Sequence, residues 1–138
     1  MSRSGYTGDI EDQWQLIRWR GAVASAIRGK RGQAFLREML VALDKIENRR
    51  LVANELKSPM FSEVCALGAV AVARGLDVSD LDPEDHESVA GVFGIRHALA
   101  CEIMWVNDEG GIRGRETEEE RYERVRRWVE KQIKPATE

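Results

Sequence analysis

The side chains best suited to bind a soft metal ion are Cys65, His86, His97 and Cys101. Thiolate and imidazole are the ligands that zinc prefers, and His97 and Cys101 are four positions apart, on one face of a helix. The chain has no C-x-x-C or H-x-x-x-H pair, however, and Cys65 lies in its most apolar segment. Two buried thiols and two surface or capped histidines therefore explain these residues better than a zinc site, and the sequence predicts no metal and no cofactor.

The same His97 and Cys101 have the residue types of a base and a nucleophile. The sequence identifies no oxyanion hole for them and no third group that would orient the histidine. The segment 29–32, Gly-Lys-Arg-Gly, is no phosphate loop, because Arg31 stands where that motif places a serine or threonine on magnesium. It would still bring cations and free backbone N–H groups to a helix start, as a modest anion site. We therefore expect no catalytic residue and no enzyme.

The net charge of −3 conceals an uneven distribution of charge along the chain. Segment 77–87 contains six acids and no base, whereas segment 18–37 contains six cations and no acid. The two segments could pair within the fold or across a dimer, or could be ordinary solvated faces. Alternatively, the basic segment could bind an anionic partner, either nucleic acid or an acidic protein surface. Its cations are Arg18, Arg20, Arg28, Lys30, Arg31 and Arg37.

Trp19 stands between Arg18 and Arg20, off the expected core stripe of its helix, and its ring needs a partner. It could cover an adjacent helix, pack on a second subunit, or stack with a base or a peptide. The sequence thus predicts a partner-binding surface in which one aromatic side chain stands among cations. The residues of this predicted surface are Arg18, Trp19, Arg20, Arg28, Lys30 and Arg31.

Segment 84–106 is the best candidate for a helix-turn-helix motif. Residues 89–95 close one helix with small residues and a glycine turn between apolar side chains. Arg96, His97, Cys101 and Glu102 would then be the candidates to face the groove of a bound DNA. The acids that open the first helix would repel phosphates, and the second helix has a single arginine. A packed helical corner is therefore the simpler interpretation, and a DNA reader is the alternative.

Two amphipathic helices are expected near the start of the chain. The first spans residues 11–28, and the glycine-rich segment 29–32 ends it and starts a second helix that continues to about residue 46. We expect the two helices to form an antiparallel hairpin. The core stripe of the first helix comprises Trp14, Ile17, Ala24 and Ile27.

The middle of the chain contains a short apolar segment and a longer one. Residues 51–56 are a very short β element or the tail of a connection. Residues 64–73 are apolar almost all round, and their length and alanine content favour a buried central helix with Gly75 as its stop.

Local signals place the remaining helices. Asp82 as N-cap and Pro83 at the first helical position predict a helix that runs to about residue 93. A further helix follows up to Asn107, and residues 107–114 have the glycines and the lack of periodicity of a loop. A capping box at 117–120 starts the last helix, which Pro135 ends.

The 138 residues, 43% hydrophobic and 33% charged, are typical of one soluble domain that needs neither a metal nor a disulfide to fold. We expect a mainly α, single-domain helical bundle of about five to six helices over residues 1–138, with flexible tails at 1–10 and 134–138. No apolar run approaches the roughly 18 residues of a membrane span. The polar start of the chain lacks the apolar region of a signal peptide, which indicates an intracellular protein with reduced cysteines.

One resemblance rests on five stretches of the sequence: residues 16–23, 28–37, 63–69, 94–95 and 107–109. With these stretches the chain resembles, over most of its length, a family of small bacteriophage and prophage proteins. Because no activity is assigned to that family, the resemblance implies a context and no residue roles. The implied context is expression inside a bacterium from a phage genome, where small proteins often act by binding.

These observations favour a non-enzymatic, cytoplasmic protein of phage type that engages a host or phage protein through the basic segment 18–37. The alternative is a helix-turn-helix regulator, in which Arg96 and His97 contact DNA bases and the first two helices contact phosphates. A homodimer would account for both the charge asymmetry and Trp19, because a two-fold interface can pair the basic segment with the acidic one. We expect no membrane association.

Overall fold

The computed structural model of the protein describes residues 13–57, 63–109 and 116–135. Helices form its regular structure, which confirms the expected mainly α fold, and the described residues contain no strand. The predicted tail at 1–10 and the last residues, 136–138, lie outside the described ranges. The helices are α1 (Gln13–Arg28), α2 (Lys30–Asp44), α3 (Ala66–Arg74), α4 (His86–Phe93), α5 (His97–Glu109) and α6 (Glu118–Gln132).

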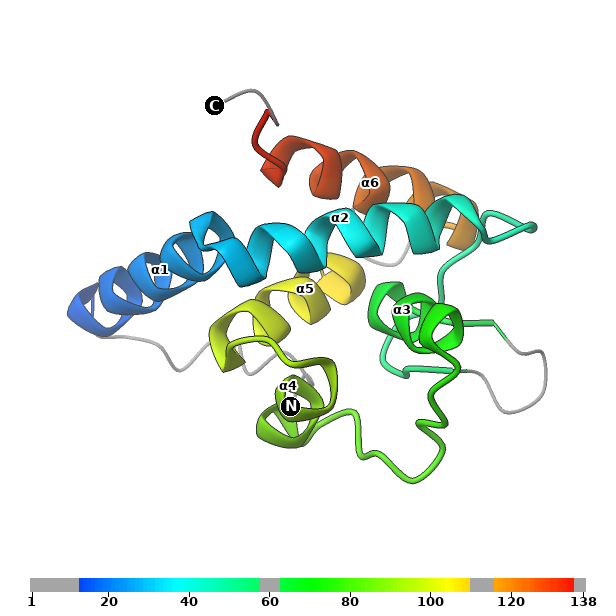
Figure 1. The fold of residues 1–138 in the computed structure, drawn as a ribbon, viewed down its shortest axis with the longest axis horizontal. Helices are drawn as coiled ribbons and strands as arrows, with labels where there is room; N and C mark the ends of the chain where they lie inside the picture. Colours follow the sequence, from blue (N-terminus) through cyan, green and yellow to red (C-terminus); the bar gives the residue numbers. More distant parts are fainter. Residues whose placement is uncertain (1–12, 58–62, 110–115, 136–138) are drawn as a thin grey trace.

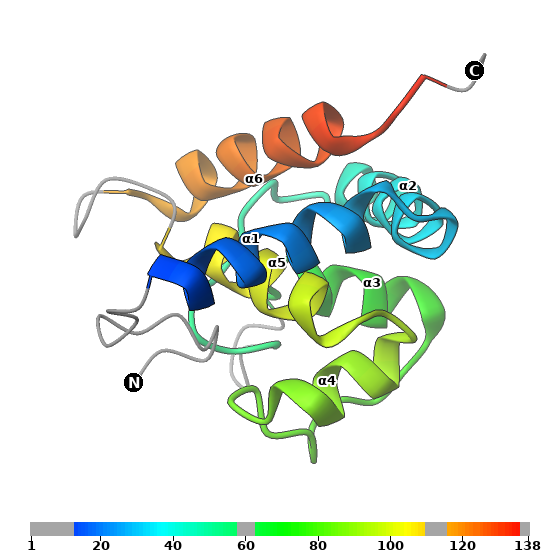
Figure 2. The ribbon, with the colours of Figure 1, turned by 90° about the vertical axis from the view of Figure 1, so that its left-hand side faces the viewer.

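Helix α5 lies at the centre of the fold, and the other helices surround it (Figure 1, Figure 2). It contacts α1, α3, α4 and α6, and its residues 99–104 are all buried. Helices α2 and α6 lie side by side and run in opposite directions along the upper side of Figure 1, while α3 packs below α2. The core is therefore a single cluster that every helix helps to build.

The β element expected at residues 51–56 is reduced to one isolated antiparallel bridge, between Lys57 and Val64. Next to it, the Cys65 N–H donates to the Leu56 carbonyl over 3.2 Å. These bonds fix the chain that enters α3 against residues 51–56, but they are too few for a ladder. The predicted buried helix is confirmed, because α3 is buried from Ala66 to Ala71, but the central position belongs to α5.

Helices α1 and α2 do not form the predicted antiparallel hairpin; they follow each other end to end with a bend (Figure 1, Figure 2). Gly29 alone separates them, with φ −66° and ψ 160° as the N-cap of α2. One residue bends the chain but cannot reverse it. The bend is tight, because a Cβ on Gly32 would lie 1.9 Å from the Ala26 carbonyl oxygen.

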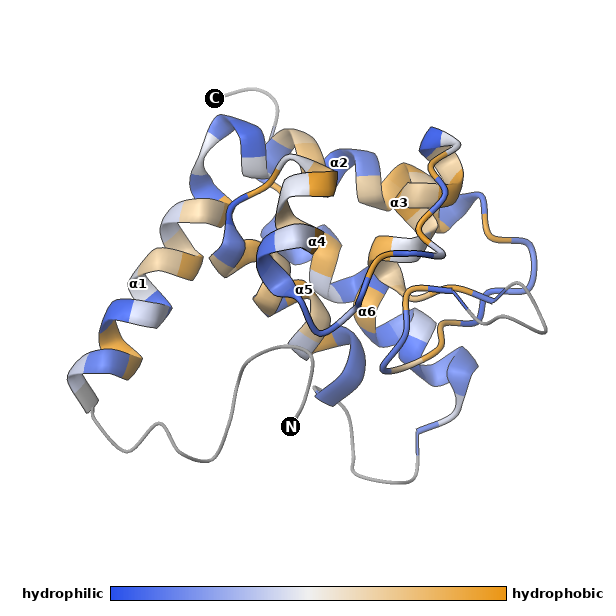
Figure 3. Cartoon of the chain, turned by 90° about the horizontal axis from the view of Figure 1, so that it is seen from below, coloured by the Kyte–Doolittle hydropathy of each residue, from blue (hydrophilic) through white to orange (hydrophobic). Residues whose placement is uncertain are grey.

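The buried side of α1 differs from the predicted stripe of Trp14, Ile17, Ala24 and Ile27. Trp14 is 70% exposed and Ile17 is 60% exposed, whereas Val23 and Ala26 are buried. In Figure 3, the first half of α1, with its apolar segments, projects away from the other helices. The prediction was wrong for Trp14 and Ile17 only, because Ala24 is half-buried and Ile27 packs against the core. Both sets of residues have helical spacing, and only the position of α5 and α2 decides which set is covered.

Helix α4 begins three residues later than predicted. Its N-cap is Asp85, whose side chain accepts from the Ser88 N–H, whereas Asp82 forms a separate turn by accepting from the Glu84 N–H over 2.9 Å. The helix ends at Gly94, which adopts the left-handed conformation with φ 71° that favours glycine. From there α5 departs at an angle of 104° to α4.

Helix α5 continues to Glu109, two residues beyond its predicted end at Asn107 and into the predicted loop 107–114. Arg124 of α6 explains the extension, since it donates to the carbonyl oxygens of Val106 and Asn107, at 2.5 and 3.3 Å. It thereby satisfies carbonyl groups that the end of a helix otherwise leaves without partners. The rest of the predicted loop, residues 110–115, lies outside the described part of the chain.

The capping box predicted for the last helix is confirmed. Thr117 accepts from the Glu120 N–H, and the Glu120 carboxylate accepts from the Thr117 N–H. Just before it, Glu116 accepts two hydrogen bonds from the Arg124 guanidinium, at 2.6 and 2.9 Å, and lies 3.5 Å from Arg121. This largely buried carboxylate joins the start of α6 to the arginine that caps α5.

Replacing Glu116 with glutamine should lower the free energy of unfolding by about 1 to 3 kcal/mol at neutral pH, because charge-assisted hydrogen bonds would be lost. The hydrogen bonds from Arg124 lower the pKa of Glu116 below its ordinary 4.5, against the opposing effect of burial. The folded-state pKa is thus below the unfolded one. The contribution is therefore complete above about pH 5 and disappears as the pH falls through the folded-state pKa.

Urea unfolding of the Glu116→Gln variant and the parent at neutral pH and near pH 3 measures this effect, and the two proteins should converge at the lower pH. Glu119→Gln is the matched control, because the Glu119 side chain is 63% exposed and its ion pair with Arg50 spans 3.4 Å. It should change stability by less than about 1 kcal/mol. A Glu116→Gln difference that persists unchanged at low pH would contradict the assignment.

Among the described residues, no single helix is both long and apolar enough to cross a membrane. The bent pair α4 and α5 meets the length and composition criterion only when its two helices are taken together.

Candidate functional site

One face of α1 is exposed and combines apolar and basic side chains. At about 100° per residue, positions 14, 17, 18, 21, 25 and 28 fall on one side of a helix, opposite Val23 and Ala26. All of these positions are exposed, and a Cβ on Gly21 would meet no atom within 4 Å. We call this side the outer face of α1; it comprises Trp14, Ile17, Arg18, Gly21, Ser25 and Arg28.

The outer face leads to a cavity of about 300 Å³ between α1, α2 and the start of α5. Lys30 and Arg31, in the first turn of α2, line this cavity together with Arg96, which directly precedes α5. Gly29 offers no side-chain acceptor to the first-turn N–H groups of α2. Two helix N-termini and three cations therefore border one cavity, an arrangement that favours an anion.

Five cations of this region are exposed and take part in no ion pair within the described ranges. A sixth, Arg37, donates a hydrogen bond to the Lys134 carbonyl and lies further along α2. We call the five the basic surface: Arg18, Arg28, Lys30, Arg31 and Arg96.

Two residues of the predicted partner-binding surface turn toward the protein instead. Trp19 is half-buried, and its ring forms a T-shaped contact with the His97 ring. The ring centroids are 5.9 Å apart and the ring planes are inclined by 78°. The Arg20 guanidinium lies 6.0 Å from the centre of the Trp105 ring. Of the interpretations open for Trp19, the structure therefore agrees with the one in which it covers an adjacent helix.

The acidic segment 77–87 does not pair with the basic surface in the part of the chain that the structure describes. Its carboxylates bind neighbouring groups: Asp77 accepts from the Ser79 N–H and hydroxyl, and Asp85 from those of Ser88. The hydrogen bond from the Ser88 hydroxyl, with that from its N–H, lowers the pKa of Asp85. Asp77 and Asp85 thus organise turns, and they do not neutralise the basic surface.

The predicted corner at 84–106 has the geometry of a helix-turn-helix motif: three residues, 94–96, join helices at 104°. However, α5 is buried on all sides from Leu99 to Met104, so it cannot lie along a DNA groove. Arg96 and His97 are exposed at its beginning. Any contact of these two residues with DNA would therefore be made by the end of the helix.

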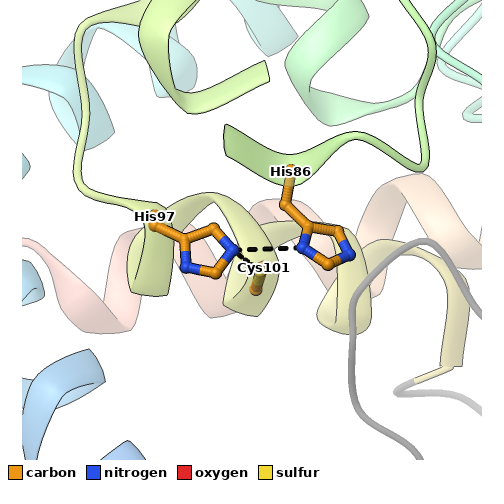
Figure 4. Close-up of side chains that lie close together, drawn as sticks. All are labelled: His86, His97 and Cys101. Carbon is orange, nitrogen blue, oxygen red and sulfur yellow. Dashed lines mark hydrogen bonds between the residues drawn. The ribbon is translucent and has the colours of Figure 1, made fainter. Parts of the chain in front are cut away.

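The same corner gathers three of the four side chains with metal-ligating chemistry (Figure 4). His86 Nδ1 lies 3.1 Å from His97 Nε2, and Cys101 Sγ lies 3.4 Å from the same nitrogen. The two imidazole rings stack with centroids 5.2 Å apart. We call these residues the histidine–cysteine cluster. Cys65 is not part of it, because its sulfur accepts from the Gly68 N–H at the start of α3.

The environment of Cys101 makes it a poor nucleophile by itself. Burial, reinforced by the charge of Glu102, raises the pKa of Cys101 to about 12. The thiol therefore stays protonated near neutral pH, and it neighbours an imidazole without becoming a thiolate. The expectation that Cys101 and His97 are not a nucleophile and its base stays a prediction.

A larger hollow, of about 710 Å³, lies between α3 and the loop that follows it. It is lined by small and apolar residues such as Ala71, Val72 and Leu76, with Asp77 at its rim. Glu55 and Lys57 also line the hollow, and the Asp77 carboxylate already accepts hydrogen bonds from Ser79. Its size alone therefore does not indicate chemistry.

The chain matches no protein-family model, no curated protein and no solved structure in the three comparisons. The resemblance to small phage proteins consequently stays a prediction.

Sequence reasoning overlooked Trp14 and Ile17 as surface residues, because their spacing also fits a core stripe. It also assigned Arg96 to DNA alone, although Arg96 lines the same cavity as Lys30 and Arg31. One signal was present in the sequence: the cations Arg18 and Arg28 have the helical spacing that places them beside Trp14 and Ile17.

Proposed function

We propose that the protein is a non-enzymatic binding protein that engages an acidic surface of a protein partner through the outer face of α1 and the basic surface. The observation that carries this proposal is the cavity where Lys30, Arg31 and Arg96 meet. Three cations from two segments far apart in the sequence converge there without neutralising acids among the described residues. In the phage context that the resemblance implies, the partner is a host or phage protein.

The composition of the outer face of α1 supports a protein rather than a nucleic acid as the partner. Trp14 and Ile17 are large apolar side chains exposed on the same face as Arg18 and Arg28. Tryptophan and arginine are enriched at protein interfaces, where an aromatic anchor is ringed by polar groups. A helix with anchors at such spacing fits a groove of another protein.

DNA is the second candidate partner, because the α4–α5 corner has helix-turn-helix geometry and exposes Arg96 and His97 at the start of α5. In this function the cations at the bend between α1 and α2 would contact phosphates. The burial of α5 and the acids Asp85 and Glu87 in the first turns of α4 oppose it.

Reversing three charges, with Lys30→Glu, Arg31→Glu and Arg96→Glu in one variant, should weaken binding of the protein partner about a hundredfold, because like charges would then face each other. The matched control reverses the exposed cations Lys45, Arg127 and Lys131, which gives the same net charge. Thermal unfolding of both variants should stay close to that of the parent, since exposed substitutions usually change stability by within about 0.5 kcal/mol each.

Affinity capture from a bacterial host, followed by titration of the purified partner, compares the three proteins. A partner bound by the parent and by the control, but not by the first variant, supports the proposal. Equal affinity for all three proteins contradicts it.

Fluorescence anisotropy with labelled mixed-sequence DNA separates the two candidates. Six phosphate contacts would lower the affinity roughly a thousandfold between about 50 and 200 mM salt. If the parent binds DNA with that salt dependence and the Lys30, Arg31 and Arg96 variant does not, the partner of the basic surface is nucleic acid. Absence of binding at the lower salt concentration ends the DNA candidate.

A further inference from the structure

We propose that His86, His97 and Cys101 form a binding site for one zinc ion, with two imidazoles and one thiolate as its ligands. The α4–α5 corner builds this site, because His86 is the first residue of α4 and His97 the first residue of α5. Cys101 follows His97 by one helical turn on the same face of α5. The inference is independent of the basic surface and of its partner.

The spacing of the ligand atoms fits a tetrahedral zinc ion. With zinc bonds of about 2.05 Å to nitrogen and 2.3 Å to sulfur, tetrahedral geometry separates two nitrogens by about 3.3 Å and nitrogen from sulfur by about 3.6 Å. The cluster has 3.1 Å between the nitrogens of His86 and His97 and 3.4 Å between His97 and Cys101. Both distances are slightly shorter than the tetrahedral values, and all three ligand atoms lie within 4.8 Å of one another, so binding requires only small shifts of the side chains.

The burial of the ligands indicates how the ion would be held. Cys101 is fully buried, His86 is half-buried and His97 is exposed. The thiolate would therefore lie on the inner side of the ion, and the fourth tetrahedral position would be taken by water. Because zinc binds the thiolate form of cysteine, binding would release the Cys101 proton to the solvent.

Zinc at this position would join α4 to the centre of the fold. Helix α4 has 8 residues and packs mainly on α5. A bond from His86 to an ion that His97 and Cys101 also hold would fix the angle of the corner, in which Arg96 of the basic surface directly precedes α5. The expected role of the ion is thus to hold this corner rigid.

Titration of the untagged full chain with Co²⁺ tests the site directly. We expect one ion per chain, the ligand-field bands of tetrahedral cobalt, and a thiolate-to-cobalt charge-transfer band in the near ultraviolet. Zn²⁺ should displace the cobalt with an apparent Kd of about 1 µM or tighter. Calorimetry in buffers of different ionisation enthalpy should detect the released proton.

Three variants assign the ligands. His86→Ala should weaken zinc binding by a hundredfold or more, because even loss of an outer-shell partner of a ligand costs about 10- to 100-fold in affinity. The circular dichroism of the metal-free protein should stay unchanged. Cys101→Ser should abolish the charge-transfer band, and Cys65→Ser, which removes the other buried thiol, should leave both the band and the affinity unchanged.

Two results would overturn the proposal. One is a parent protein whose Kd for Zn²⁺ is weaker than about 1 mM. The other is a His86→Ala variant that binds zinc as tightly as the parent. If Cys101→Ser does not fold, His86→Ala and His97→Ala still decide the assignment, because both histidines lie at least partly at the surface.

Discussion

Replacing Gly68 with alanine is expected to lower the free energy of unfolding by about 3 kcal/mol or more. A Cβ at this position would lie 1.9 Å from the Leu56 carbonyl oxygen and 3.0 Å from the Val64 Cβ. Both neighbours are held, since Leu56 accepts the Cys65 N–H and Val64 forms the bridge to Lys57. To admit one methyl group, α3 must move away from this segment and lose these hydrogen bonds.

Urea unfolding measured by circular dichroism checks this prediction, with Gly91→Ala as its matched control. Gly91 also lies within a helix, but a Cβ there would meet no atom within 4 Å. Alanine at position 91 should therefore stabilise the protein by up to about 1 kcal/mol, because alanine has the higher helix propensity. A Gly68→Ala protein as stable as the parent would show that α3 does not approach Leu56 so closely.

Replacing Asn107 with leucine is expected to cost about 2 to 5 kcal/mol of stability. Asn107 is completely buried near the end of α5. Its side chain accepts from the Ala66 N–H over 3.1 Å and donates to the Val52 carbonyl over 2.9 Å and to the Asp108 carboxylate over 2.8 Å. Leucine has a similar volume, so the loss would come from buried backbone groups left without partners.

The same unfolding experiment applies, with Asn48→Leu as the control. Asn48 is exposed and accepts a single local hydrogen bond from the Arg50 N–H. Its replacement should cost less than about 1 kcal/mol. If both asparagine variants lost less than about 1 kcal/mol of stability, the hydrogen bonds of the buried Asn107 side chain would not stabilise the protein as proposed.

Local signals predicted most of the helices well, because they depend on residues close together in the chain. The capping box of Thr117 and Glu120 and the glycine stops at Gly75 and Gly94 are where the sequence indicates them. Asp82 was misleading, since an aspartate before a proline forms a turn as readily as a helix start. Asp85, which caps the helix, is bonded to Ser88 three residues on.

The sequence predicted the residues of the candidate site but not how they come together. The sequence identifies the cations of segment 18–37, but their convergence with Arg96 depends on the bend at Gly29 and on the position of α5. Likewise, His97 and Cys101 share a helix face by spacing alone, whereas His86 joins them only through the angle between α4 and α5. The local sequence does not indicate which side chains of separate helices will be in contact.

What the sequence determined by itself is therefore the all-α class, the helices and most of their ends, because backbone propensity and capping act over a few residues. The tertiary structure decided which face of α1 is buried, with Val23 inside and Trp14 outside. It also decided that Asn107 satisfies backbone groups of distant segments. These outcomes depend on which apolar surfaces meet, and a helix with two plausible stripes acquires its inner side only when its neighbours pack against it.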